Sequence, residues 1–391
     1  MSSFIIGTIA HISDLHFTQK LTEKGRRRWT KGGLKSHSFA KTEALAGEFR
    51  KFRRWGLDVV VATGDISTDG DIGSLETARK FLETDRIYEY PPRRLLGRGL
   101  ALEPERCLIV PGNHDRYGQG PVPLQTGFLS FESVFSEPDE GYPYVIGCQL
   151  KPSAYISTPA IIFFVFDSTL PKDVPAAAWN RIARGHIRET ECTWLREQKE
   201  EIRRSKQVLG LNGEFLQVDY DNSIRIAVLH HHPVIPQEEV KVQSELQMVQ
   251  SGPATARGWV GNVANKLDYD SMLMINDRLF MGACFDVGID IVLFGHQHQA
   301  YRRICRPDDY SDFRKIKDTT AHDIHLFCCP TTTEYKAKDS GFYLIHFFTN
   351  YFKVVPYIWN KSEENGYSFI EDVENTEDYE YARNIPWSTA S

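Results

Sequence analysis

The sequence predicts an α/β fold in which mixed sheets are flanked by helices, and two patterns support this prediction. Short apolar runs end abruptly at polar clusters, as buried strands do. These runs are 5–12, 57–62, 107–110, 161–166, 224–229 and 289–294. Segments of helical periodicity alternate with them. These segments are 39–55, 73–85, 188–204 and 269–285.

Near the C-terminus the pattern changes to apolar runs without helices between them. They cover 323–328, 341–348 and 351–358, and Thr349 and Asn350 join the last two as in a hairpin. Residues 363–380 are rich in Asp and Glu. We therefore expect one domain over residues 1–358, with insertions at about 20–35 and 236–266, followed by an acidic tail at 359–391.

The composition is that of a globular protein with a large core. Of 391 residues, 41% are hydrophobic and 25% charged. A net charge of -6 gives no overall attraction to nucleic acid or to an anionic membrane. The seven cysteines form no CxxC pair, which indicates reduced thiols. The sequence has no signal-peptide pattern and no run of about 18 apolar residues, so we expect a cytoplasmic protein without a membrane partner.

Five polar clusters lie at or just beyond the ends of the predicted strands, where open α/β sheets bind ligands. They are Asp14-Leu15-His16, Gly64-Asp65, Gly112-Asn113-His114-Asp115, His230-His231-His232-Pro233 and Gly295-His296-Gln297-His298. A single strand-end Asp or His is usually structural, but five such clusters are not explained in that way. Carboxylate, carboxamide and imidazole donors without a thiolate are typical of Mn, Fe or Zn at sites with open positions. The sequence therefore predicts a metal site at this edge.

The spacing inside the clusters has a physical reason. Alternate residues of a strand share a face, so Asp14 and His16 are expected to reach one ion together. His296 and His298 have the same spacing, and a bend at Gly295 would direct their rings to two ions. In three clusters a glycine precedes a candidate ligand, where the missing Cβ lets the backbone turn sharply and approach a metal or phosphate closely. These glycines are Gly64, Gly112 and Gly295.

The ordered series D-x-H, G-D, G-N-H-D, H-x-P and G-H-x-H, between residues 14 and 298, resembles the signature of the calcineurin-like metallophosphoesterases. The resemblance implies a β-sandwich of mixed sheets flanked by helices, with a dinuclear metal site at the strand ends. It implies hydrolysis of a phosphate ester by a hydroxide that bridges two divalent metal ions. The implied ligands are Asp14, His16 and His298 for one metal and Asn113, His231 and His296 for the other, with Asp65 bridging. Pro233 sets the H-x-P register on His231, and His230 is the alternative.

Two further residues of the G-N-H-D segment, and the arginine that follows it, have expected roles. The resemblance makes His114 face the phosphate, where it protonates the leaving oxygen or stabilises developing charge. Asp115 is then expected to orient the His114 ring. Arg116 is expected either to contact the substrate or to lie in solvent.

The sequence departs from two branches of this family and resembles a third. The segment after Asp65 has neither the Asp-Arg-Gly of protein Ser/Thr phosphatases nor the tyrosine of purple acid phosphatases. Phe166-Asp167-Ser168, and Gly185-x-Ile187 ahead of Trp194-Leu195, resemble the class III cyclic-nucleotide and glycerophosphodiester phosphodiesterases. We therefore expect a phosphodiesterase that acts on a cyclic nucleotide or another small diester.

Two alternatives differ in class. Residues 20–35 carry seven Lys and Arg, and with Trp29 and Trp259 as stacking rings they would suit a DNA or RNA nuclease on the same metals. A solvated loop, or a loop paired with the acidic tail, explains the same charges. A non-catalytic binding module is disfavoured because every ligand position is filled.

Overall fold

A computed structural model describes most of the chain, and the site lies within the described part. The described residues are 4–18, 37–89, 94–116, 128–135, 141–151, 159–169, 185–234, 274, 276–310, 321–334, 337, 339–362 and 366–382. The expected insertions at 20–35 and 236–266, with Trp29 and Trp259, lie outside these residues.

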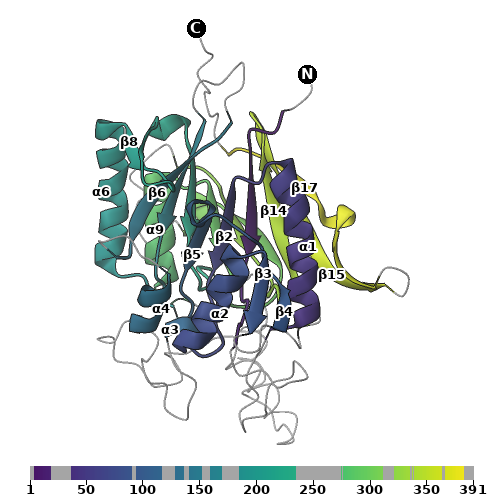
Figure 1. Ribbon diagram of the computed structural model, residues 1–391. Coiled ribbons are helices and arrows are strands. Elements are labelled where there is room, and N and C mark those ends of the chain that lie inside the picture. The colour runs from purple at the N-terminus through teal and green to yellow at the C-terminus, as the bar shows by residue number, and fades with distance from the viewer. Residues whose placement is uncertain are drawn as a thin grey trace, which may run out of the picture.

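Two sheets face each other with helices on their outer sides (Figure 1). The first has the order β16-β15-β14-β1-β2-β5, and β17 pairs with β15. Strands β1, β2 and β5 are parallel, and β14 is antiparallel to β1. Its strands are β1 (Gly7–Ile12), β2 (Val59–Thr63), β5 (Cys107–Val110), β14 (Gly341–Phe347), β15 (Tyr351–Ser362), β16 (Gly366–Glu371) and β17 (Glu377–Glu380).

The second sheet has the order β12-β13-β11-β10-β7-β6. Its four central strands are parallel, and the edge strands β12 and β6 are antiparallel. The strands are β6 (Tyr144–Gln149), β7 (Ala160–Val165), β10 (Ile224–Val228), β11 (Ile291–Phe294), β12 (Tyr301–Cys305) and β13 (Ile324–Cys328). Two small hairpins are separate from both sheets. They are β3 (Arg86–Glu89) with β4 (Arg94–Arg98), and β8 (Gln207–Leu209) with β9 (Phe215–Gln217).

The helices cover the outer faces of the sheets. Residues of α1 (Phe39–Trp55) and α2 (Ile72–Glu83) pack with the first sheet, and those of α6 (Glu189–Ser205) and α9 (Asp277–Val287) pack with the second. Shorter helical elements are α3 (Asn113–Arg116), α4 (Phe128–Val134), η1 (Pro104–Arg106), η2 (Tyr220–Asn222), η3 (Pro307–Tyr310) and η4 (Val373–Asn375). Gly56 ends α1 with a φ of 99°, and its amide donates to the Phe52 carbonyl.

The layering follows from the residue alternation of the central strands. In β7, Ile161, Phe163 and Val165 belong to the core between the two sheets, whereas Ile162 and Phe164 belong to the core under α6 and α9. All of these side chains are fully buried. A strand that is covered on both faces needs apolar residues at every position, which is the continuous apolar run seen in the sequence.

The predicted α/β class with mixed sheets and flanking helices is confirmed. The predicted helix at 39–55 coincides with α1, and the hairpin at Thr349 and Asn350 joins β14 to β15. The helix predicted at 269–285 corresponds to α9, which begins at Asp277. Of residues 269–276, the structure describes only 274 and 276.

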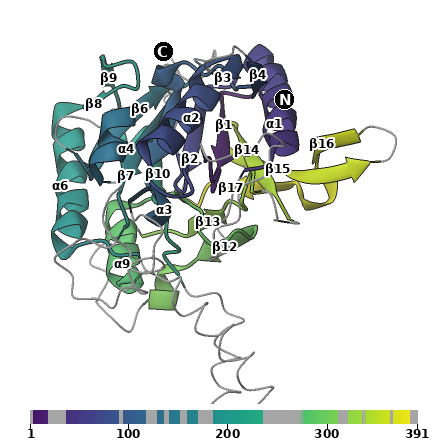
Figure 2. The ribbon, with the colours of Figure 1, turned by 60° about the horizontal axis from the view of Figure 1, so that its bottom comes forward.

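The expected boundary at residue 358 needs correction. It falls inside β15, and two strands from the acidic segment, β16 and β17, pair with β15. Figure 2 shows β15 and β16 extending together away from the rest of the fold. The acids did not prevent strand formation because β17 is largely exposed, so its carboxylates remain in water. No helix among the described residues is long and apolar enough to span a membrane.

Candidate metal centre

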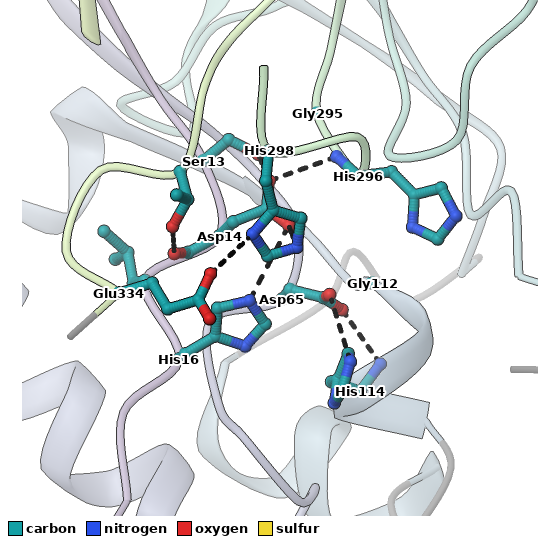
Figure 3. Close-up of polar contacts among 12 residues, drawn as sticks. Ser13, Asp14, His16, Asp65, Gly112, His114, Gly295, His296, His298 and Glu334 are labelled. Atoms are coloured by element: carbon teal, nitrogen blue, oxygen red, sulfur yellow. Dashed lines mark hydrogen bonds and ion pairs between the residues drawn. The ribbon is translucent and has the colours of Figure 1, made fainter. Parts of the chain in front are cut away.

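Two groups of side chains, all buried except the partly exposed His298, gather where the parallel strands of both sheets end. One group contains Asp14, His16, Asp65 and His298, and the other contains His230, His231 and His296. Within each group the donor atoms lie within 4.8 Å of one another. Figure 3 shows that the residues of the first group converge from separate loops. His296 and His298 thus belong to different groups, and the backbone bends over residues 296–299, directly after Gly295.

The backbone at this centre is unusual. Seven described non-glycine residues have positive φ, and five of them belong to the two groups. They are Asp14 (52°), His16 (51°), Asp65 (49°), His296 (76°) and His298 (58°). Left-handed backbone in residues with a Cβ costs of order 1 kcal/mol each, and it concentrates at functional sites.

The expectation that Asp14 and His16 lie on one face of a strand is wrong. Strand β1 ends at Ile12, so the two side chains do not share a strand face. They converge because both residues have a left-handed backbone conformation. Their loop is fixed to the end of β2 by hydrogen bonds from Asp14 N to the Gly64 carbonyl (3.0 Å) and from His16 N to the Asp65 carbonyl (2.9 Å).

The three glycines are required by close approach, although what approaches them is neighbouring parts of the protein; approach to a metal or phosphate stays a prediction. A Cβ on Gly64 would overlap the His230 ring, and one on Gly295 would overlap the Ser13 hydroxyl. A Cβ on Gly112 would overlap the amide and carboxylate of Asp65. Each glycine therefore lets two strand-end loops meet at the centre.

The Asp14 carboxylate has two different oxygens. Oδ2 accepts from the Ser13 hydroxyl (2.5 Å) and from His296 N (3.1 Å), which fixes its orientation. Oδ1 is buried and accepts no hydrogen bond, although His298 Nε2 lies 3.2 Å and His16 Nε2 3.8 Å away. A buried carboxylate oxygen among imidazole nitrogens is a cation environment.

In the second group His230 has a defined orientation. Its Nδ1 lies 2.6 Å from the Thr63 carbonyl, which makes Nδ1 a donor. Its Nε2 lies 3.1 Å from Asn113 Oδ1, 3.2 Å from His296 Nδ1 and 3.4 Å from Asp65 Oδ1. His230, the alternative to His231 in the sequence reading, therefore reaches both Asn113 and Asp65.

His231 lies in the same group and is held by Ser168. The Ser168 hydroxyl is 3.0 Å from His231 Nδ1, and it also accepts from the backbone amides of His230 (3.1 Å) and His231 (3.0 Å). The opposite nitrogen, Nε2, is buried without a hydrogen bond. The group thus holds one imidazole more than the sequence reading required.

The electrostatics of the centre favour positive charge. Burial alone would raise the pKa of Asp65, but His114, His230 and His16 around it hold that pKa well below its ordinary value. Burial alone would lower the pKa of His230, but the Asp65 charge raises it to about 9. Two buried carboxylates, several imidazoles and one carboxamide, without thiolate, fit two divalent cations that prefer oxygen and nitrogen.

Comparison with known proteins agrees with this geometry. The sequence pattern of the calcineurin-like phosphoesterases matches residues 7–300, a span that contains both groups. The chain belongs to the calcineurin-like phosphoesterase family. Metal-dependent phosphoester hydrolysis is therefore its general chemistry. None of the curated protein sequences is similar enough to count as a relative.

Solved structures with related chains have low sequence identity. A dimetal phosphatase from Danio rerio is 12% identical, with a TM-score of 0.46 over 97% of this chain and 100% of that one. A purple acid phosphatase from yellow lupin (Lupinus luteus) seeds is 12% identical, with a TM-score of 0.49 over 100% of this chain and 57% of that one. PhoD is 8% identical, with a TM-score of 0.45 over 97% of this chain and 71% of that one.

His114 lies beside the phosphoesterase centre without belonging to either group. Its backbone amide donates to Asp65 Oδ1 (2.8 Å), and its ring Nδ1 lies 3.0 Å from the Thr68 carbonyl. Its Nε2 is 3.8 Å from Asp65 Oδ2, and the side chain is 13% exposed. A ring that is fixed through Nδ1 and partly exposed is placed to exchange a proton through Nε2.

Asp115 does not orient the His114 ring, which corrects the role expected for it. Its carboxylate accepts from the amides of Ile66 (3.1 Å), Ser67 (2.7 Å) and Gly112 (2.9 Å), and from the Ser67 hydroxyl (2.8 Å). Burial and the Asp65 charge raise the pKa of Asp115, and these donors oppose the rise. Asp115 therefore joins the loop that carries Asp65 to the loop that carries Asn113.

Arg116 has neither of the two roles considered. It is 2% exposed, and its guanidinium pairs with Asp167 (2.9 Å) and Glu132 (3.1 Å) over the Phe131 ring. It thus ties α3 to α4 and to the end of β7. Its positive charge is therefore paired with carboxylates of the protein itself.

Ser13 and Glu334 were not predicted from the sequence, and Ser168 was noted only as part of a motif, without its contacts to His230 and His231. Glu334 Oε2 lies 2.8 Å from His298 Nδ1. It lies six residues beyond Cys328, the last residue of β13, whereas the five polar clusters begin within two residues of their strand ends. No comparable sequence signal marked Glu334.

Proposed function

We propose that this phosphoesterase hydrolyses a phosphodiester, a cyclic nucleotide or another small diester, with two divalent cations held by the two groups. The observation that carries the proposal is the position of Asp65. Asp65 belongs to the first group, and its Oδ1 also lies 3.4 Å from Nε2 of His230 in the second group. One carboxylate therefore serves both groups, as a dinuclear site requires.

The ligand sets follow from these positions. Asp14, His16 and His298 would hold one cation, and Asn113, His230, His231 and His296 the other, with Asp65 between them. Two cations held by these residues would supply a hydroxide near neutral pH and would neutralise charge on the phosphate. The all oxygen and nitrogen donor set favours Mn, with Fe and Zn as alternatives.

The chain itself supplies proton transfer. The Thr68 carbonyl holds the His114 ring by Nδ1, so Nε2 is the atom that gives a proton to the leaving oxygen. Loss of an alkoxide from a diester needs such a proton.

The diester preference is supported by the class III resemblance. Ser168 of that motif holds His230 and His231, and Gly185 of the other motif leaves room for His231, because a Cβ there would overlap its ring. Both motif residues thus shape the second group.

The experiment compares substrates in chelator-treated and Mn-reconstituted protein. We expect hydrolysis of bis(p-nitrophenyl) phosphate to disappear with chelator and return with Mn, and cyclic nucleotides or glycerophosphodiesters to be cleaved with little salt dependence. Full activity after complete metal removal would contradict the dinuclear proposal.

A nuclease on the same centre is the second candidate because of the seven cations in residues 20–35. A protein that neutralises several phosphates loses affinity steeply with salt. Oligonucleotide cleavage that exceeds small-diester turnover, collapses at moderate salt and disappears when Arg26, Arg27 and Arg28 are changed to Ala would favour the nuclease.

A further inference from the structure

Glu334 lies next to the centre on a segment outside the region that matches the family pattern. That match ends at residue 300, whereas Glu334 follows β13. Its side chain is 13% exposed, and Oε2 is 2.8 Å from His298 Nδ1 (Figure 3). The other nitrogen of that ring, Nε2, is 3.2 Å from Asp14 Oδ1. Glu334, His298 and Asp14 therefore form a line from carboxylate through imidazole to carboxylate.

A carboxylate at one imidazole nitrogen fixes the state of the other. Nδ1 carries the proton that Glu334 accepts, so the Nε2 lone pair points toward Asp14 and is available to a cation. We propose that Glu334 is a positioning residue for the first metal: it fixes the tautomer and the ring orientation of His298 and so raises cation affinity. The inference rests on the proposed role of His298 as a ligand.

The backbone at Glu334 is fixed from the side of α1. Lys41 is 3% exposed, and its Nζ donates to the carbonyls of Glu334 (2.7 Å) and Ala337 (2.8 Å) and to the Ser340 hydroxyl (2.7 Å). His37, just before α1, forms an antiparallel bridge with Glu334. A buried ammonium with three oxygen partners is strongly held. The Glu334 carboxylate thus projects from a fixed backbone.

The three threonines before Glu334 bind the loop that carries Asp14. Thr332 N donates to the Ser13 carbonyl (2.9 Å), and the Thr332 hydroxyl accepts from Ser13 N (3.1 Å). The Thr331 hydroxyl donates to the Asp14 carbonyl (2.8 Å), and the Thr333 hydroxyl donates to the Leu15 carbonyl (2.5 Å). Residues 331–334 therefore set the positions of Asp14 and Glu334 together, with His298 between them.

The test measures metal affinity rather than turnover. Wild type, Glu334→Gln and Glu334→Ala are treated with chelator and titrated with Mn by calorimetry. We expect one of the two sites to weaken by about 10 to 100-fold, more in Glu334→Ala because Gln keeps an acceptor, while the other site is unchanged. Glu48→Gln is the matched control, since Glu48 is a largely buried carboxylate that pairs with Lys51 (2.8 Å) away from the centre.

Two readouts separate positioning from general stability. The melting temperature in chelator should be the same for wild type and Glu334→Gln, whereas the increase on adding Mn should be smaller in the variant. In a His298→Ala background, Glu334→Gln should cause no further loss of Mn affinity, because its effect passes through His298.

Each outcome has a distinct meaning. Unchanged affinity at both sites in Glu334→Ala, or an equal loss in the His298→Ala background, would overturn the positioning role. A melting temperature in chelator that falls as far as the metal-bound one would also overturn it. Wild type that binds no Mn would instead overturn the proposed function.

Discussion

Gly112 and Asp65 pack against each other so closely that Gly112 has no room for a side chain. A Cβ on Gly112 would lie 2.9 Å from Asp65 Cγ and would overlap the Asp65 amide and Oδ1. The Asp65 carboxylate is therefore held in place by the backbone of the loop that carries Asn113. The position of Asp65 thus depends on Gly112, a residue that has no side chain to bind a metal.

We expect Gly112→Ala to lose bound metal almost as completely as Asp65→Asn. The methyl group would displace Asp65, which faces both groups, so both metals should be affected. Metal per chain after gel filtration is the measurement. Gly282→Ala is the matched control, because a Cβ on Gly282 in α9 meets nothing within 4 Å. Two tightly bound metals in Gly112→Ala would show that the loops relax independently.

His114→Ala should keep both metals and lose rate by about two to four orders of magnitude, as expected for a general acid. The loss should be smaller for a diester whose leaving group has a low pKa, because such a group departs without a proton. Kinetics with p-nitrophenyl and alkyl leaving groups, together with metal content, check this. If the variant loses metal, His114 is a ligand and the proposed role fails.

Much of the fold and centre could be predicted because buried strands and their ends have strong local signals. The apolar runs at 107–110 and 224–229 match β5 and β10 to within one residue at each end. The five polar clusters were visible because Asp, Asn and His recur directly after several buried strands, and such groups need a partner when they are buried. Strands β16 and β17 were not predicted because the acids of residues 363–380 conceal them: β16 forms a hairpin with β15, and the acidic β17 is stabilised by pairing with β15.

The roles of Asp115, Arg116 and Glu334 could not be predicted because they depend on loop geometry. Asp115 is one residue from His114, yet its carboxylate turns to the amides of Ile66 and Ser67. Glu334 reaches His298 only because residues 331–334 pack on the Asp14 loop. Left-handed backbone at Asp14 and His16 removes the strand alternation on which the sequence argument relied.

Glu191 gives a pH dependence away from the metals. Burial raises its pKa from 4.5 to about 7, against the hydrogen bond from Arg188 N that lowers it. The folded protein therefore keeps a proton that the unfolded chain releases, and this group lowers the free energy of unfolding as pH rises from about 4.5 to 7.

In Glu191→Gln, which cannot ionise at this position, the pH-dependent decrease in the free energy of unfolding is absent. The free energy of unfolding of the variant, relative to wild type, should thus increase by on the order of 1 to 3 kcal/mol between pH 5 and 8. Urea unfolding at several pH values is the measurement, with Glu197→Gln, an exposed acid on the same helix, as control. Parallel stability curves for Glu191→Gln and wild type would contradict the prediction.

The three consecutive histidines should separate into two that bind metal and one that packs. His230 Nε2 faces Asn113 and Asp65, and His231 Nε2 is buried without a hydrogen bond, so His230→Ala and His231→Ala should each bind one metal fewer.

His232 packs against Phe294 and Tyr301, and burial lowers its pKa to about 3, so it stays neutral in the core. His232→Ala should keep both metals and lose melting temperature through the cavity it leaves. Metal content and thermal unfolding of the three variants, measured side by side, decide the matter. If His230→Ala keeps both metals while His231→Ala does not, the H-x-P register alone identifies the ligand, and His230 serves only to carry the contact from Thr63 to Asn113.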